Sequence, residues 1–97
     1  MIEHIGMLKF ESFTTKSQKD MLISKLQNLG ELIPSVAKIK AGYNFSGKNK
    51  GFDIGISAQF ENRNDLEDFL KHPLHIEVAS FSKEIGLKDI ITVDFTF

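Results

Sequence analysis

The chain has 97 residues, 12 Lys and Arg against 13 Asp and Glu, and no cysteine. This length suits one domain, which we place at residues 1–97. The balanced charge argues against a dedicated nucleic-acid or membrane-surface binder, and the lack of cysteine excludes disulfides and thiolate chemistry. The sequence shows neither a signal peptide nor an apolar run of membrane-spanning length, so we expect a cytoplasmic protein with no membrane partner.

The first predicted element is a strand over residues 2–10. Apolar and polar residues alternate there, with His4 and Leu8 on one face and Ile5 and Met7 on the other. A period of two is typical of a β-strand. His4 lies on the more apolar face, which we expect helices to cover.

A helix is predicted over residues 14–30. Thr15 and Gln18 have the spacing of a capping box, and Gly30 is a natural C-terminal stop. The apolar stripe of this helix has helical spacing and consists of Leu22, Leu26 and Leu29.

Two further strands follow the turn that Pro34 imposes. Residues 37–44 alternate as a second strand, and residues 52–60 alternate as a third. The segment between them, residues 45–51, is rich in glycine, lysine and asparagine, and predicts a long hairpin loop.

Next comes a helix that is broken by a proline. Asn64 is expected to cap its start, and Pro73 should end the first part near Lys71 or His72. Pro73 then begins a second helical run, with His75 in its first turn. The helix dipole disfavours a charged imidazole at that place, so His75 is a candidate base or hydrogen-bond acceptor. The simpler interpretation is a helix kink with two partly exposed histidines.

The last predicted strand covers residues 91–97, which completes the order βαββαβ. This order predicts an α+β, ferredoxin-like fold, with a four-stranded antiparallel sheet and helices on one face. The bare face is expected to be half apolar, so that a second copy covers it and a homodimer forms through the sheets. The residues expected on the bare face are Ile5, Met7, Ser57, Gln59, Thr92 and Asp94.

Several motifs together resemble one known family. They are I-x-H-I-x-x-L-K-F at the start, G-Y-N-F-S, K-G-F-D-I, H-P-x-H and the closing V-D-F. The chain is similar over its whole length to the stress-responsive dimeric α/β-barrel (Dabb) domain family. That resemblance implies two protomers whose sheets pack face to face into a barrel, with the helices outside.

The resemblance also implies a cleft between sheet and helices. In a plant branch of the family that cyclises polyketides, the histidine that closes H-P-x-H acts as base, which matches His75, and a first-strand histidine matches His4. A tyrosine and a third-strand histidine of that branch fall on Phe69 and Ile54 here, so two polar groups are absent. The residues expected to line the cleft and bind a ligand are Leu8, Ile54, Ile56 and Phe69.

The function we expect is the binding of a small apolar or keto ligand in this cleft, without established catalysis. The alternative is a cyclase-like lyase or a monooxygenase-like enzyme with His75 as base. We expect His4 and His75 to share the cleft, where desolvation favours neutral imidazole, and His72 to cap the helix break.

Two other partners, a metal ion and RNA, have little support in the sequence. A metal site at His72 and His75 has weak support, because Pro73 breaks the helix that would align them. RNA stacking would need an aromatic residue where Ile54 stands. We therefore expect no metal, no cofactor and no nucleic acid.

Overall fold

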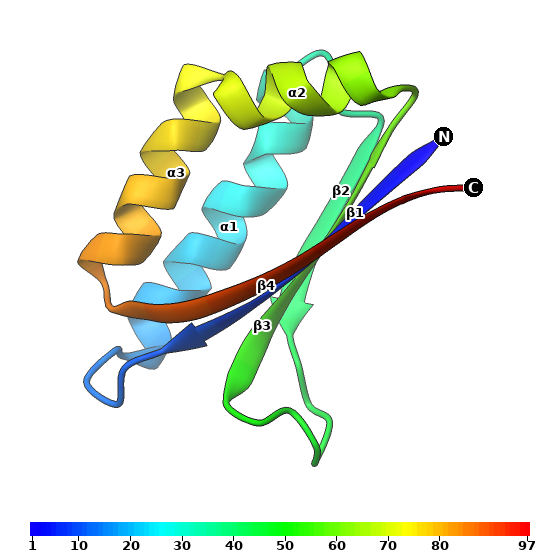
Figure 1. The fold of residues 1–97 in the computed structure, drawn as a ribbon. Coiled ribbons are helices and arrows are strands. Elements are labelled where there is room, and N and C mark those ends of the chain that lie inside the picture. The colour runs from blue at the N-terminus through cyan, green and yellow to red at the C-terminus, as the bar shows by residue number, and fades with distance from the viewer.

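The computed structural model describes residues 1–97, and its elements follow the predicted order (Figure 1). The strands are β1 (Ile2–Phe10), β2 (Lys38–Tyr43), β3 (Phe52–Phe60) and β4 (Leu87–Thr96). The helices are α1 (Lys16–Leu32), α2 (Arg63–Lys71) and α3 (Pro73–Glu84). The four strands pair antiparallel in the order β2-β3-β1-β4. The predicted ferredoxin-like α+β fold is confirmed.

All three helices lie on one face of the sheet, and the other face carries no element of the chain (Figure 1). The core fills the space between the helices and the sheet. Burial of each large apolar side chain there contributes about 1.5 to 3 kcal/mol. The core consists of Ile2, Leu8, Leu22, Leu26, Leu29, Ile33, Val36, Ile54, Ala58, Phe60, Leu66, Phe69 and Ile85. None of the helices is long and apolar enough to cross a membrane.

Helix α1 begins as predicted and ends later than predicted. The capping box is formed, since the Thr15 hydroxyl accepts from the Gln18 amide at 3.1 Å and the Gln18 side chain accepts from the Thr15 amide at 2.9 Å. The prediction that Gly30 stops the helix is wrong, because α1 continues to Leu32. Gly30 instead permits close packing on β2, since a Cβ there would lie 2.6 Å from Cγ2 of Ile39.

The predicted break between α2 and α3 is confirmed at His72. This residue has extended backbone before Pro73, and its Nδ1 accepts a hydrogen bond from the Leu74 amide at 3.1 Å, as an N-cap does. The predicted cap at Asn64 is wrong. Asn62 caps α2 by accepting from the Asp65 amide at 2.9 Å, so the helix starts earlier than expected.

The pairing of β1 with β4 corrects the predicted bare face. Asp94 lies opposite His4 and Thr92 opposite Gly6, so both side chains belong to the helix side. Their neighbours on β4, which include Ile91 and Val93, therefore face outward beside Met7 and Ile5. Ser57 and Gln59 lie on the bare face as predicted, since they pair with Ile5 and Glu3. The bare face is thus more apolar than the sequence suggested.

Candidate functional site

His4 is held on the helix side of β1 by an acidic partner. Its side chain is 13% exposed, and its Nδ1 is hydrogen-bonded to Oδ1 of Asp94 on β4. A carboxylate at Nδ1 favours a proton on that nitrogen, so Nε2 is the ring nitrogen left to meet a ligand. The prediction that Asp94 lies on the opposite face is wrong. Only the register of β1 against β4 brings it to His4, and alternation within one strand does not give that register.

His75 enters the site from the first turn of α3. Its ring centroid lies 4.6 Å from that of Phe69, which is itself almost fully buried and packs on Phe60. Burial lowers the pKa of His75, the nearby backbone of Leu70 opposes part of this change, and the charge of His4 adds to it. Nδ1 of His75 is buried and meets no partner at hydrogen-bonding geometry. The expected neutral imidazole is therefore favoured here.

The ring of Phe69 connects the two histidines. His4 approaches it edge-on, with centroids 6.5 Å apart, while His75 lies tilted against it. His4 and His75 thus contact the same aromatic ring, from β1 and from α3. His72 does not join them, because its Nδ1 is used to cap α3.

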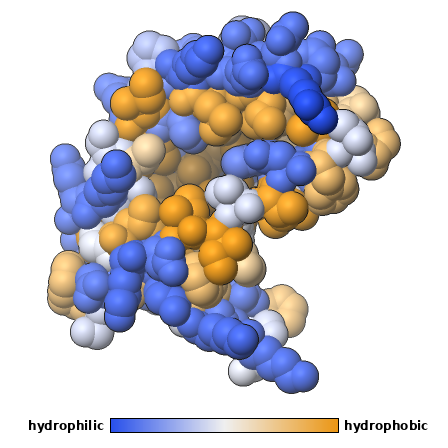
Figure 2. Space-filling model, in the orientation of Figure 1, coloured by the Kyte–Doolittle hydropathy of each residue, from blue (hydrophilic) through white to orange (hydrophobic).

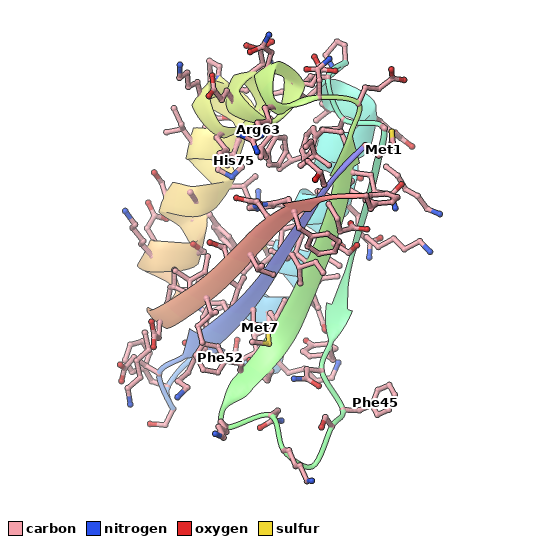
Figure 3. The ribbon with its side chains drawn as sticks, turned by 45° about the vertical axis from the view of Figure 1, so that its right-hand side comes forward. Met1, Met7, Phe45, Phe52, Arg63 and His75 are labelled. Carbon is pink, nitrogen blue, oxygen red and sulfur yellow. The ribbon has the colours of Figure 1, made fainter.

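The molecule is hollowed between the helices and β4, and apolar residues form much of the walls (Figure 2). A cavity of about 230 Å³ lies between α2 and β4, with Arg63, Leu66 and Asp94 among its lining residues. Asp94 therefore contacts His4 and also borders open space. Figure 3 shows His75 at the start of α3, beside the helix junction and toward the sheet. Arg63, the only arginine of the chain, lines this cavity and is not among the residues predicted for the site.

The four residues expected to line a ligand cleft occupy different depths. Leu8 and Ile54 belong to the closed core, where they are 3% and 0% exposed. Ile56 is half-buried and packs against that core, whereas Phe69 lies between the two histidines. Their contact with a ligand stays a prediction. No group of three or more His, Asp or Glu side chains lies close enough together to hold a metal ion.

Comparison with known proteins gives the family. Residues 2–97 match the family described as the stress responsive A/B barrel domain (Dabb). The chain belongs to this family. The resemblance inferred from the strand histidine and the H-P-x-H motif is therefore confirmed.

This A/B barrel chain is similar to one curated protein in sequence and to two solved structures in fold. Olivetolic acid cyclase from Cannabis sativa is 29% identical over 97 residues, which span 98% of this chain and 95% of the cyclase. A dimeric ferredoxin-like protein from Thermobifida fusca superposes with a TM-score of 0.86 at 21% identity, covering 99% of this chain and 90% of that one. Hydroxynitrile lyase from Passiflora edulis superposes with a TM-score of 0.85 at 21% identity, covering 99% and 95%. The two superpositions establish a shared fold.

Proposed function

We propose that this A/B barrel chain forms a homodimer and binds a small, largely apolar molecule in the hollow between its helices and β4. The observation that carries the ligand proposal is the contact of Phe69 with both His4 and His75, whose polar atoms are set in apolar surroundings. The cavity beside this cluster is lined by Asp94, the hydrogen-bond partner of His4, and apolar cavities with a few convergent polar groups are typical of small-molecule sites. The homodimer is supported by the apolar bare face and by the dimeric relative.

The polar groups of the site favour a ligand that donates a hydrogen bond. Neutral His75 is an acceptor or a base, and His4, whose Nδ1 is held by Asp94, has its Nε2 left to meet the ligand. Phe69 has no hydroxyl with which to stabilise a developing oxyanion. The ligand class that fits is therefore an apolar molecule with a hydroxyl group or with a keto group in its enol form.

A second candidate function is proton transfer in a lyase or cyclase reaction. The lowered pKa of His75 favours it, since a base must be neutral to accept a proton. In hydroxynitrile cleavage, His75 would take the hydroxyl proton as the carbon–carbon bond breaks and cyanide leaves. In a cyclisation, it would take a proton from carbon beside a keto group.

Isothermal titration with olivetolic acid, and with mandelonitrile as a hydroxynitrile, tests both functions. We expect binding by the wild type and at least about a tenfold weaker binding by His75→Ala, the loss of one hydrogen bond and its packing. His72→Asn is the matched control, because asparagine also caps helices. Equal binding by His75→Ala and the wild type would refute the assigned role.

Turnover separates the two candidates. Cyanide release from mandelonitrile, or a cyclised product from a synthetic polyketide, would establish catalysis if it is lost with His75→Ala. Binding without turnover would leave the ligand-binding function. Phe69→Tyr adds the missing hydroxyl beside both histidines, and we expect it to raise any turnover of the wild type.

A further inference from the structure

The only arginine of the chain lines the cavity between α2 and β4. Arg63 is the first residue of α2, and the same cavity of about 230 Å³ is lined by Asp94, the hydrogen-bond partner of His4. Arg63 takes part in none of the three ion pairs of the chain. The N–H donors of its guanidinium group are therefore available to an acceptor group of a ligand.

Helix α2 adds to the positive potential at Arg63. The dipole of a helix places partial positive charge at its first turn, where some backbone N–H groups have no partner within the helix. Asp65 shares that turn but does not line the cavity. Two carboxylates do line it, but Asp94 is engaged by His4, and Glu67 is exposed to water one turn after Arg63. The Arg63 end of the cavity therefore favours a negative group, with Glu67 as its main opponent.

We propose that Arg63 binds a carboxylate of the ligand, so that the ligand is an apolar hydroxy acid or keto acid. This inference rests on the proposed ligand-binding function and names a second polar group of that ligand. The planar guanidinium group matches a carboxylate through two parallel hydrogen bonds. The hydroxyl or enol of the same ligand is left to meet His75, and the apolar part lies against Leu66, which lines the cavity.

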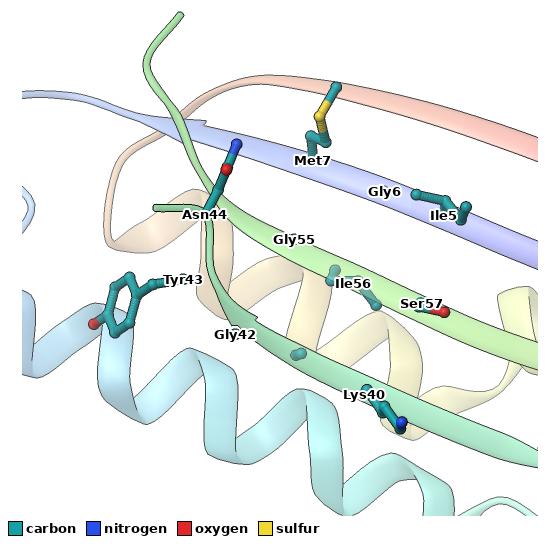
Figure 4. A pocket seen from close by; sticks show the side chains of 11 residues that line it. Ile5, Gly6, Met7, Lys40, Gly42, Tyr43, Asn44, Gly55, Ile56 and Ser57 are labelled. Atoms are coloured by element: carbon teal, nitrogen blue, oxygen red, sulfur yellow. The ribbon is translucent and has the colours of Figure 1, made fainter. Parts of the chain in front are cut away.

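Two other hollows of the molecule also contain a cationic side chain. One has a volume of about 450 Å³, lies over β2 and β3 on the bare face, and contains Lys40 (Figure 4). The other lies between α1 and α3 and contains Lys25, whose Nζ is placed over the ring of Phe81. Neither hollow is lined by a histidine. A lysine also offers a point charge and not a planar pair of donors. Arg63 is therefore the cation that suits an acid in the proposed site.

A pair of ligands that differ only in the carboxylate tests the role of Arg63. Olivetolic acid carries an alkyl chain, two hydroxyls and a carboxylate on one ring, and olivetol is the same molecule without the carboxylate. Isothermal titration at neutral pH gives both affinities. Arg63→Met keeps an unbranched apolar side chain and removes the charge. It should weaken the binding of the acid at least about tenfold, the loss of a charge-assisted contact, and leave the binding of olivetol unchanged.

Two further variants give the sign of the effect and its location. Glu67→Gln removes the opposing charge from the same cavity, so it should tighten the binding of the acid by up to about fivefold and leave olivetol unchanged. Lys40→Met is the matched control, because it also removes one positive charge but from the hollow on the bare face. It should leave both affinities unchanged. Circular dichroism verifies that each variant is folded.

The possible outcomes separate this inference from the proposed function. If the wild type binds neither ligand, both the carboxylate contact and the proposed ligand binding are refuted. If Arg63→Met weakens the acid and olivetol alike, or weakens neither, the ligand-binding function stands and the carboxylate contact is wrong. If Lys40→Met weakens the acid as much as Arg63→Met does, the effect belongs to the overall charge of the chain, and the assignment to Arg63 is overturned.

Discussion

The two faces of the sheet differ in how their apolar residues are covered. On the helix side, Ile54 and Phe60 are fully buried by the chain itself. On the bare side, Ile91 and Val93 remain 48% and 51% exposed. β4 is an edge strand that borders both the hollow beside His4 and the bare face. The helix side therefore forms the core and the candidate site, whereas the bare side is the surface on which we propose that a second copy packs.

The strongest test of this contrast compares one phenylalanine from each face. Phe60 is 0% exposed and Phe95 is 46% exposed. Phe60→Ala should lower the free energy of unfolding by about 3 to 5 kcal/mol, because it leaves a cavity in the core. Phe95→Ala should cost the isolated protomer less, because half of its surface is already in water. Urea unfolding followed by circular dichroism measures both.

Protein concentration separates the two effects further. The loss from Phe60→Ala should persist at every concentration, whereas the loss from Phe95→Ala should grow with concentration over the range in which the wild type dimerises. If Phe95→Ala destabilises a dilute, monomeric sample as strongly as Phe60→Ala does, the distinction between the faces is wrong.

Glycines give a smaller test of the same contrast. Alanine at Gly30 would favour the helix by about 1 kcal/mol. Its Cβ would, however, lie 2.6 Å from Ile39, a contact that must be relieved by moving α1 or β2. We expect a net loss of about 1 to 2 kcal/mol in the free energy of unfolding for Gly30→Ala. Gly42→Ala has free space on the bare side and should leave the stability of the fold unchanged or slightly raised.

Thermal unfolding of these two variants gives the comparison directly. A lowered melting temperature for Gly30→Ala and an unchanged one for Gly42→Ala is the expected pair of results. A stabilised Gly30→Ala would show that helix propensity outweighs the close approach of α1 to β2.

Much of the fold could be predicted from the sequence because its signals are local. The capping box at Thr15 and the break at Pro73 depend on residues within one turn of each other, and both predictions are confirmed. The prediction that Gly30 ends the helix is wrong because it, too, used only local sequence. A glycine near a helix end usually marks a stop, and only the distance to Ile39, on another element, shows that it serves packing.

The candidate site could be predicted only in part, because its geometry depends on pairing between distant strands. His4 and Asp94 are 90 residues apart and meet through the register of β1 and β4. Alternation shows that Ile91 and Val93 share a face, but it does not say which face the helices cover. The apolar side chains of β4 would ordinarily be assigned to the core. In this fold they face outward, on the bare face.

A pH titration tests the neutral state of His75. Burial lowers the pKa of His75 in the folded chain, while the unfolded chain keeps a value of about 6.5. The unfolded state therefore binds more protons in the window below that value, and the free energy of unfolding should fall as pH falls through it. Replacing His75 by a residue without an imidazole removes its part of the pH dependence of the free energy of unfolding. Between pH 7.5 and pH 5, roughly spanning the window, His75→Gln should lose less stability than the wild type.

The matched control for the titration is His72→Asn, which keeps the cap and removes a different imidazole. Both variants are compared with the wild type over the same pH range. Parallel losses in the wild type and His75→Gln would mean that burial of His75 does not favour its neutral form. NMR of the His75 ring protons would then report a pKa near the ordinary value.

The smallest expected effect lies at the far edge of the helix-covered face, where Tyr43 joins β2 to α1. Its hydroxyl donates to Oδ1 of Asp20 at 2.5 Å. Desolvation and this hydrogen bond raise the pKa of Tyr43 to about 12. Tyr43 is the only tyrosine, so ultraviolet absorbance of the phenolate reports it alone. Asp20→Asn removes the negative charge and should move the pKa back toward 10, with little loss of stability because the pair is exposed. A wild-type phenol that titrates near 10, while circular dichroism still shows a folded chain, would refute this link between β2 and α1.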